Sequence, residues 1–380
     1  MLQSLPTTKC LSSPASSFDP SPVIQQYRQG LIDTFGPGTQ YADALRRRNA
    51  TQAYDPRLRL AKERTVVEGP WLQGAVIHFL ERGEGDSQSL ETDGLCSTIP
   101  LICYLASAYP SMSLTEVQSH VSQAASVLST HSFARRHTLC AAVILASLIR
   151  RASSSSEGTE GTEDKVLKVV KVVGEEEADE EDVRRDLDVD PHPHPHLPRD
   201  LLGGDALLAA AARVEADWTS LGLCVAPTEA SEAGALVHEL EDVSAAVREG
   251  ERHSTCQKRW GSTCSYPGSF MGALLAVCEA KSAATSTSYT TSSSSSSSEA
   301  GGEEVCGFAG AIRRIIRAGG CNCSRANLAG ALLGAEFGFG GPYGVPLDWI
   351  EKTDRANEVM RLCLERLEGD AEASRQPLTD

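Results

Sequence analysis

The chain has 380 residues and a formal net charge of −16 at pH 7, and it is long enough for one large hydrophobic core or two modest ones. An acidic chain is a poor match for nucleic acid, because neutralising phosphates requires a basic surface. No apolar run approaches the ~20 residues that span a bilayer. We therefore expect a soluble, cytoplasmic protein with neither a membrane nor a nucleic-acid partner.

Residues 1–22 are rich in Ser and Pro, and Lys9 is their one basic residue. Organelle transit peptides are rich in Arg, so this composition favours a disordered tail over a transit peptide. Beyond the tail, apolar residues recur three and four positions apart, which is typical of amphipathic helices. We expect helices over about 21–35, 41–48, 69–80, 99–106, 114–128 and 138–149.

Two low-complexity stretches interrupt this pattern. Residues 152–200 contain serine runs, acidic runs and the sequence PHPHPH, and residues 282–304 are rich in Ser. Such sequences bury too little apolar surface to become ordered. We predict two disordered insertions in a single helical domain, residues 23–368, with a tail at 369–380. Between the insertions, further helices are expected over 201–214, 231–247 and 258–280.

The three histidines of the PHPHPH sequence are His192, His194 and His196. Such a tract can bind a metal ion adventitiously. Alternating prolines favour a polyproline II conformation with three residues per turn, in which these side chains do not converge on one ion. A linker is therefore the simpler interpretation.

The chain has 12 cysteines, and most lie in apolar, helix-like surroundings without a dense framework of short spacings. No secretory signal precedes them, which favours free thiols in a reducing compartment. Cys321 and Cys323 could hold zinc together with Cys256 and Cys264. Zinc loops, however, usually separate their cysteines by two to four residues, so partly buried free thiols are the favoured interpretation.

The most informative stretch lies near the carboxyl terminus. A helical pattern over 308–316 ends at Gly319 and Gly320, and a second helix, rich in small residues, is expected over 325–337. Asn322 or Ser324 could cap this second helix. The free amides and positive dipole end of the helix would then face whatever occupies the loop. A last amphipathic helix is expected after residues 346–350.

The sequence AGGCNCSRANLAGALLGAEFG, followed by GVPLDWIEKT, resembles the carboxyl-terminal signature of the ADP-ribosylglycohydrolases, particularly their branch of J1-crystallin and selenoprotein-J-like proteins. The resemblance implies an all-α fold, a compact multi-helix orthogonal bundle, which we expect to be a monomer. It also implies two Mg²⁺ ions, held by an early Asp-rich loop and by the carboxyl-terminal loop. The metal-binding residues in this chain would be Asn322 and Ser324, with Cys321 at a position where family members have Asp.

Two further features are similar to the same branch. In that branch the Asp-Gly pair, here Asp93 and Gly94, lies where the nucleotide site is approached, and the histidine corresponding to His131 faces ADP-ribose. The resemblance thus implies ADP-ribose or an ADP-ribosylated substrate, bound by Asp93, Gly94 and His131, and indicates no catalytic residue. The simpler alternative is that Asp93 and His131 only cap the helices that follow them. We expect His137 at the surface.

Two departures from the family pattern bear on activity. A thiol at Cys321 is a poor ligand for Mg²⁺, which requires oxygen donors. The early Asp-rich loop has no counterpart, since the nearest segment, 35–40, lacks a carboxylate. One hypothesis is a hydrolase that uses Mg²⁺ to cleave an N- or O-glycosidic bond to ADP-ribose, with activity weakened or lost. The other is a non-catalytic, crystallin-like structural or nucleotide-binding protein.

Overall fold

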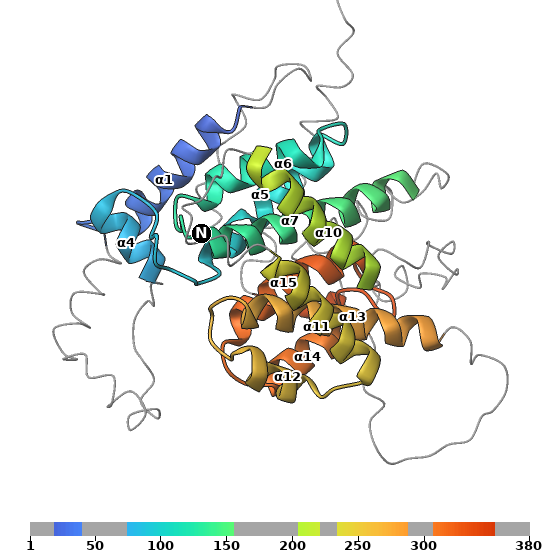
Figure 1. Cartoon of the computed structure of the whole chain (residues 1–380). Coiled ribbons are helices and arrows are strands. Elements are labelled where there is room, and N and C mark those ends of the chain that lie inside the picture. Colours follow the sequence, from blue (N-terminus) through green and yellow to red (C-terminus); the bar gives the residue numbers. More distant parts are fainter. Residues whose placement is uncertain (1–18, 40–73, 156–203, 221–233, 288–306, 354–380) are drawn as a thin grey trace, which may run out of the picture.

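The computed structural model describes residues 19–39, 74–155, 204–220, 234–287 and 307–353. Within these ranges the chain forms α-helices joined by loops, and extended pairing is limited to isolated bridges. The predicted all-α fold is confirmed (Figure 1). The predicted helix at 41–48, the Gly-Pro-Trp start at 69–71, most of the amino-terminal tail and the end of the last helix lie outside the described residues.

Helix boundaries follow local sequence signals. For example, a Ser113 and Glu116 capping box opens one helix, with the Glu116 amide 3.2 Å from the Ser113 hydroxyl and the Ser113 amide 2.8 Å from the Glu116 carboxylate. Such reciprocal bonds satisfy amides that have no partner inside the helix. The helices are α1 (Ser21–Phe35), α4 (Gly74–Arg82), α5 (Asp93–Ala108), α6 (Leu114–Ala125), α7 (Ser132–Ser155), α10 (Gly204–Ser220), α11 (Ala235–Glu249), α12 (His253–Trp260), α13 (Gly268–Thr287), α14 (Phe308–Arg317), α15 (Asn322–Phe337) and α16 (Leu347–Glu351).

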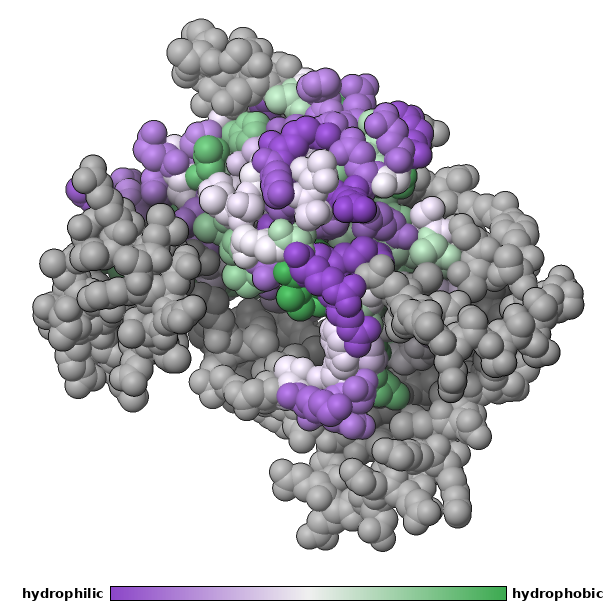
Figure 2. Space-filling model, turned by 90° about the horizontal axis from the view of Figure 1, so that it is seen from below, coloured by the Kyte–Doolittle hydropathy of each residue, from purple (hydrophilic) through white to green (hydrophobic). Residues whose placement is uncertain are grey.

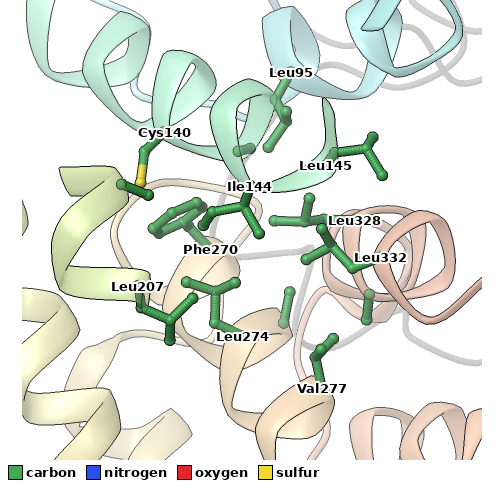
Figure 3. Packing of buried hydrophobic residues seen from close by; sticks show 14 of the residues in the cluster. Leu95, Cys140, Ile144, Leu145, Leu207, Phe270, Leu274, Val277, Leu328 and Leu332 are labelled. Carbon is green, nitrogen blue, oxygen red and sulfur yellow. The ribbon is translucent and has the colours of Figure 1, made fainter. Parts of the chain in front are cut away.

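One large core joins the two ends of the sequence. α7 packs against α5, α6, α10 and α15, and α13 packs against α11, α12, α14 and α15. Figure 3 shows Leu95 of α5, Ile144 of α7, Phe270 of α13 and Leu328 of α15 converging from separate helices. Burying each such side chain stabilises the fold by about 1.5–3 kcal/mol. α15 is therefore fixed against both the early helix α5 and the late helix α13.

A smaller cluster attaches the amino-terminal helices. Leu31 and Phe35 of α1 pack with Val76 and Phe79 of α4, and Leu128, which precedes α7, completes the group. Figure 1 shows α1 and α4 side by side at one edge of the bundle. α1 and α4 are thus held against the segment that leads into α7.

α7 is longer and more apolar than the sequence suggested. Its segment Ser132–Ala152 could cross a membrane by length and composition alone, contrary to our expectation that no run is long enough, but 72% of the scanned window is buried inside the protein. This burial is typical of a central core helix. The described surface in Figure 2 is largely hydrophilic with small apolar areas. The large hydrophobic side chains that are exposed among the described residues are Ile32, Ile316 and Phe339.

Both predicted insertions begin later than expected. α7 continues to Ser155 and α13 to Thr287, so residues 152–155 and 282–287 are helical rather than disordered. Extending a helix that is already packed adds a hydrogen bond per residue at little cost, which explains the overrun. The remainder of each insertion lies outside the described residues.

Candidate functional site

Main-chain hydrogen bonds join the loops that precede α5, α13 and α15. The Thr92 amide donates to the Cys264 carbonyl at 3.0 Å, and the Cys321 amide donates to the Ser262 carbonyl at 2.7 Å. The loop between α12 and α13 therefore forms the middle of a three-loop assembly. It brings the amino ends of α5 and α15 to one place, although Asp93 and Asn322 are 229 positions apart in the sequence.

The turn between α14 and α15 requires glycine. Gly319 and Gly320 have φ angles of +77° and +69°, a left-handed region that side chains other than glycine rarely adopt. A Cβ atom on Gly320 would lie 2.2 Å from the Ser262 carbonyl oxygen. The prediction that this glycine pair ends a helix is confirmed, and Gly320 also permits the close approach of the two loops.

Asp93 is the first residue of α5, and Thr92 occupies the cap position. The interpretation of Asp93 as an ordinary cap is therefore wrong. Its carboxylate oxygen Oδ2 is buried and has no hydrogen-bond partner among the described residues, as is the case for Oε2 of Glu91. Burial, followed by the negative charge of Glu91, raises the pKa of Asp93 to about 7. Asp93 is thus positioned to exchange a proton near neutral pH.

Glu91 is a site residue that the sequence analysis missed. The Cys264 thiol donates to its Oε1 atom at 3.6 Å. Burial, and next the Glu91 charge, raise the pKa of Cys264 to about 12, so this thiol remains a protonated donor at neutral pH. Glu91 stands two positions before Asp93, and this spacing of two acids was the signal that could have found it.

Two thiols lie at the start of α15. We call this part of the site the thiol side, and the part formed by Glu91 and Asp93 the acidic side. The sulfur atoms of Cys321 and Cys323 are 3.4 Å apart, and the Cys321 sulfur is also 3.4 Å from the Ser324 hydroxyl. Burial by itself raises the pKa of Cys321, but hydrogen bonds from Ser324 and Cys323 and the positive charge of Arg325 outweigh it. The pKa of Cys321 is consequently lower than that of an ordinary cysteine.

The charge of Asp93 contributes to the raised pKa values of two neighbouring residues, Cys96 and Tyr27. Burial raises the pKa of Cys96 to about 12, and the charges of Asp93, Cys323 and Cys321 contribute to the rise. Cys96 is therefore within electrostatic reach of both sides of the site. Burial also raises the pKa of Tyr27 to about 12, with a contribution from Asp93, so α1 extends the site from the amino-terminal edge.

Arg325 holds the loop before α15 through its hydrogen bonds. Its side chain is 0% exposed, and its guanidinium donates to the Gly319 carbonyl and, at 3.0 Å, to the Asn322 side-chain oxygen. Cys321 occupies the cap position of α15 without a side-chain capping bond. The expectation that Asn322 or Ser324 caps this helix is wrong, because Asn322 holds Arg325 and the Ser324 hydroxyl contacts the Cys321 sulfur.

His131 caps the helix that follows it, as one of the two sequence interpretations proposed. Its Nδ1 atom accepts a hydrogen bond from the Phe133 amide at 3.2 Å. The other interpretation, contact with ADP-ribose, stays a prediction. Gly94 is buried, and a Cβ atom there would lie 3.4 Å from the Ala125 carbonyl oxygen, which is an ordinary van der Waals contact. The proposed contact of Gly94 with a substrate stays a prediction.

His137 is buried, and the expectation that it lies at the surface is wrong. It is 1% exposed, and its Nε2 atom lies 2.5 Å from the Glu239 carboxylate while Nδ1 lies 2.7 Å from the Phe133 carbonyl. The ring also packs against Tyr266 and Phe270, at centroid distances of 4.8 and 5.1 Å. His137 thus joins α7 to α11 and α13 and belongs to the core.

The donor atoms on the thiol side do not fit a pair of Mg²⁺ ions. Mg²⁺ requires hard oxygen ligands in near-octahedral geometry, whereas this loop presents the sulfur atoms of Cys321 and Cys323 beside a single hydroxyl, that of Ser324. Within the described ranges, no group of three or more His, Cys, Asp or Glu residues is arranged to hold a metal ion. Hard oxygen atoms are available on the other side, at Glu91 and Asp93.

The fold and the site define an all-α protein with a polar site at the amino ends of its helices. The family model described as ADP-ribosylglycohydrolase matches residues 3–377, and the chain belongs to this family. The sequence resemblance is thereby confirmed for the family as a whole.

A curated relative agrees with the crystallin branch. The chain is similar to Crystallin J1A of Tripedalia cystophora, with 30% identity over 104 residues, which is 27% of this chain and 24% of that protein. The match therefore spans about a quarter of each chain. No solved structure matches the chain.

Proposed function

We propose that this chain binds ADP-ribose, or the ADP-ribosyl part of a modified substrate, where the loops before α5, α13 and α15 meet. Membership of the ADP-ribosylglycohydrolase family supports this ligand class. The observation that carries the proposal is the pair of buried carboxylate oxygens on Glu91 and Asp93 that lack partners among the described residues. Buried polar atoms are normally hydrogen-bonded, and ribose hydroxyl groups would satisfy these oxygens as donors.

The reaction that fits this ligand is hydrolysis of an N- or O-glycosidic bond to ADP-ribose. A carboxyl group with a pKa of about 7, such as that of Asp93, is suited to accept or donate a proton at neutral pH. In glycosidases the two catalytic carboxyl groups lie about 5–9.5 Å apart, on either side of the bond. Glu91 and Asp93 are instead close enough for the charge of Glu91 to raise the pKa of Asp93, so we treat them as one acidic pair.

We further propose that hydrolysis is weak in the natural protein. The family resemblance implies assistance by Mg²⁺, and the soft sulfur of Cys321 is a poor ligand for that ion. The carboxyl groups of Glu91 and Asp93 can hold a ribose hydroxyl group or orient a water molecule. Because the charge of Glu91 raises the pKa of Asp93, the two groups do not titrate independently and do not act as a separate acid and a separate base.

Thermal unfolding with ADP-ribose, with and without Mg²⁺, tests the binding proposal. A ligand that binds only the folded state stabilises it by about 2.7 kcal/mol at 100 times its Kd, so ADP-ribose is expected to raise the Tm. The variant Asp93→Asn, which keeps the side-chain shape, should reduce this shift. Adenosine serves as the matched ligand control. Absence of a Tm shift at millimolar ADP-ribose, confirmed by calorimetry, would overturn the proposal.

The Cys321→Asp variant tests the proposed loss of metal assistance. A carboxylate at this position supplies a hard, charged oxygen donor, so the variant should bind Mg²⁺ in calorimetry and release ADP-ribose faster than wild type. Cys321→Ser is the matched control, because it supplies an oxygen without a charge. Wild type that already releases ADP-ribose efficiently with Mg²⁺ would show that the thiol does not limit the reaction.

A second candidate is a structural protein without catalytic activity, and the similarity to Crystallin J1A favours it. In that case the Glu91 and Asp93 pair would be retained without a ligand. Neither ADP-ribose nor Mg²⁺ would then change the Tm of wild type or of Asp93→Asn. The same thermal experiment therefore separates the two candidates.

A further inference from the structure

Cys321 and Cys323 form a pair of neighbouring thiols that the proposed function does not use. Their sulfur atoms are 3.4 Å apart, closer than the sum of ordinary packing distances for two sulfur atoms, and both residues are free cysteines. Cys323 is exposed and Cys321 is half-buried. A small oxidant can therefore reach the pair from solvent.

We propose that Cys321 and Cys323 are a redox-active dithiol that a hydroperoxide converts into an intramolecular disulfide. The pair already lies near the distance needed, since a disulfide bond measures about 2.05 Å. Cys321 is the cap residue of α15, and its φ of −75° and ψ of 90° are not helical. Its sulfur can move toward Cys323 without breaking a turn of α15.

Contacts around the pair favour Cys321 as the sulfur that reacts first. The Ser324 hydroxyl lies 3.4 Å from the Cys321 sulfur, close enough to donate a hydrogen bond to it. Cys323, whose sulfur is 3.4 Å from that of Cys321, is then the neighbouring thiol that completes the disulfide.

The two chemical steps balance as follows. The Cys321 thiolate attacks one oxygen of hydrogen peroxide; a sulfur–oxygen bond forms, the oxygen–oxygen bond breaks, and hydroxide leaves to take up a proton as water. The Cys323 sulfur then attacks the Cys321 sulfur; the disulfide bond forms, the sulfur–oxygen bond breaks, and the hydroxyl leaves as a second water with the Cys323 proton. Two thiols are oxidised by two electrons and one peroxide is reduced to two waters.

Other thiols of the site lack this arrangement. Cys264 donates to the Glu91 carboxylate and Cys256 donates to the Glu251 carboxylate. Burial raises the pKa of Cys96 to about 12. Because the thiolate is the form that reacts with peroxide, these protonated thiols should react more slowly than the Cys321 and Cys323 pair.

Mass spectrometry of the full chain tests the proposal. Trypsin cleaves after Arg317 and Arg325, so one peptide, AGGCNCSR, carries both cysteines and no others. The protein is treated with one to several equivalents of hydrogen peroxide, unfolded in guanidinium with an alkylating reagent, and digested. We expect this peptide to become lighter by two hydrogen atoms and to escape alkylation, before peptides that carry Cys96 or Cys264 are oxidised. Dithiothreitol should reverse the change.

Single variants provide the controls. Cys323→Ser removes the second thiol, so its Cys321 should accumulate as a sulfenic acid that dimedone traps, and the two-hydrogen loss should disappear. Cys264→Ser keeps the pair and should behave as wild type. The proposal is overturned if the wild-type peptide stays fully alkylated while other cysteines are oxidised, or if it gains oxygen without ever losing two hydrogen atoms. Neither result depends on ADP-ribose, so failure here is distinct from failure of the proposed function.

Discussion

The two sides of the site differ in which buried polar atoms lack a partner. On the acidic side, Glu91 and Asp93 each bury a carboxylate oxygen with no partner among the described residues. On the thiol side, Arg325 donates through Nη2 to the Gly319 carbonyl and the Asn322 side chain, while its Nε and Nη1 atoms have no partner among the described residues. An unsatisfied buried group costs about 1–3 kcal/mol. The acidic side therefore leaves hydrogen-bond acceptors open, and the thiol side leaves donors open.

Arg325→Ala should break the thiol side and gives the largest expected effect. The variant removes a fully buried side chain that holds the Gly319 carbonyl and the Asn322 side chain. Truncation of large buried side chains costs about 2–5 kcal/mol, so we expect a loss of about 4 kcal/mol in the free energy of unfolding in urea. Arg317→Ala, in the last turn of α14, is the matched control. A loss below about 1 kcal/mol would show that Arg325 does not support the loop.

Gly320→Ala tests the loop contact without changing a polar side chain. The added Cβ atom would meet the Ser262 carbonyl oxygen at 2.2 Å, at a φ of +69°. Strained left-handed residues cost about 1–3 kcal/mol, and we expect about 3 kcal/mol here because a clash is added. Gly319→Ala shares the left-handed φ but meets nothing within 4 Å. Equal losses in the two variants would contradict the close approach of the loops.

Asp93→Asn should act on the acidic side through pH. The pKa of Asp93 is raised to about 7 in the folded protein, above an unfolded value of about 3.9, so the folded state binds its proton more tightly. Wild type therefore loses stability as pH rises from about 4 to about 7, and the loss is complete above that. The variant lacks this dependence. We therefore expect the free energy of unfolding of the variant, minus that of wild type, to be about 2 kcal/mol larger at pH 8 than at pH 4.

Urea unfolding of wild type and Asp93→Asn at both pH values measures this difference directly. Asp86→Asn, which changes a carboxyl group in the same loop whose Oδ1 accepts from the Gln88 amide, controls for the loss of one negative charge. A constant difference between wild type and Asp93→Asn across the pH range would mean that Asp93 titrates normally in the folded state.

Glu91→Gln is expected to have the smallest effect and separates the two carboxyl groups. Removing the Glu91 charge lowers the pKa of Asp93, because that charge is the largest contribution to its rise after burial. We expect a decrease of about one unit, equivalent to about 1.4 kcal/mol, measured by NMR titration of the Asp93 carboxyl carbon. An unchanged titration midpoint would show that burial alone sets this pKa.

Local sequence patterns predicted the fold but only part of the site. Periodicity and glycine positions gave α14, the Gly319 and Gly320 turn and most of α15, because these features depend on neighbouring residues. Glu91 was missed, and Cys264 was considered only as a zinc ligand, because main-chain bonds between distant loops bring the two residues together. His137 was expected at the surface, whereas Glu239 on another helix pairs with its ring.

The hydrogen bonds between the three loops have a consequence for how such a protein can change over evolution. They use backbone amides and carbonyl groups, such as those of Thr92, Ser262 and Cys321, which every residue type except proline can provide. Side chains at these positions can thus be exchanged while the framework that presents them is preserved. An exchange between an oxygen-bearing and a sulfur-bearing side chain at position 321 therefore requires no new architecture, because the Cys321 amide bonds to Ser262 whatever the side chain is.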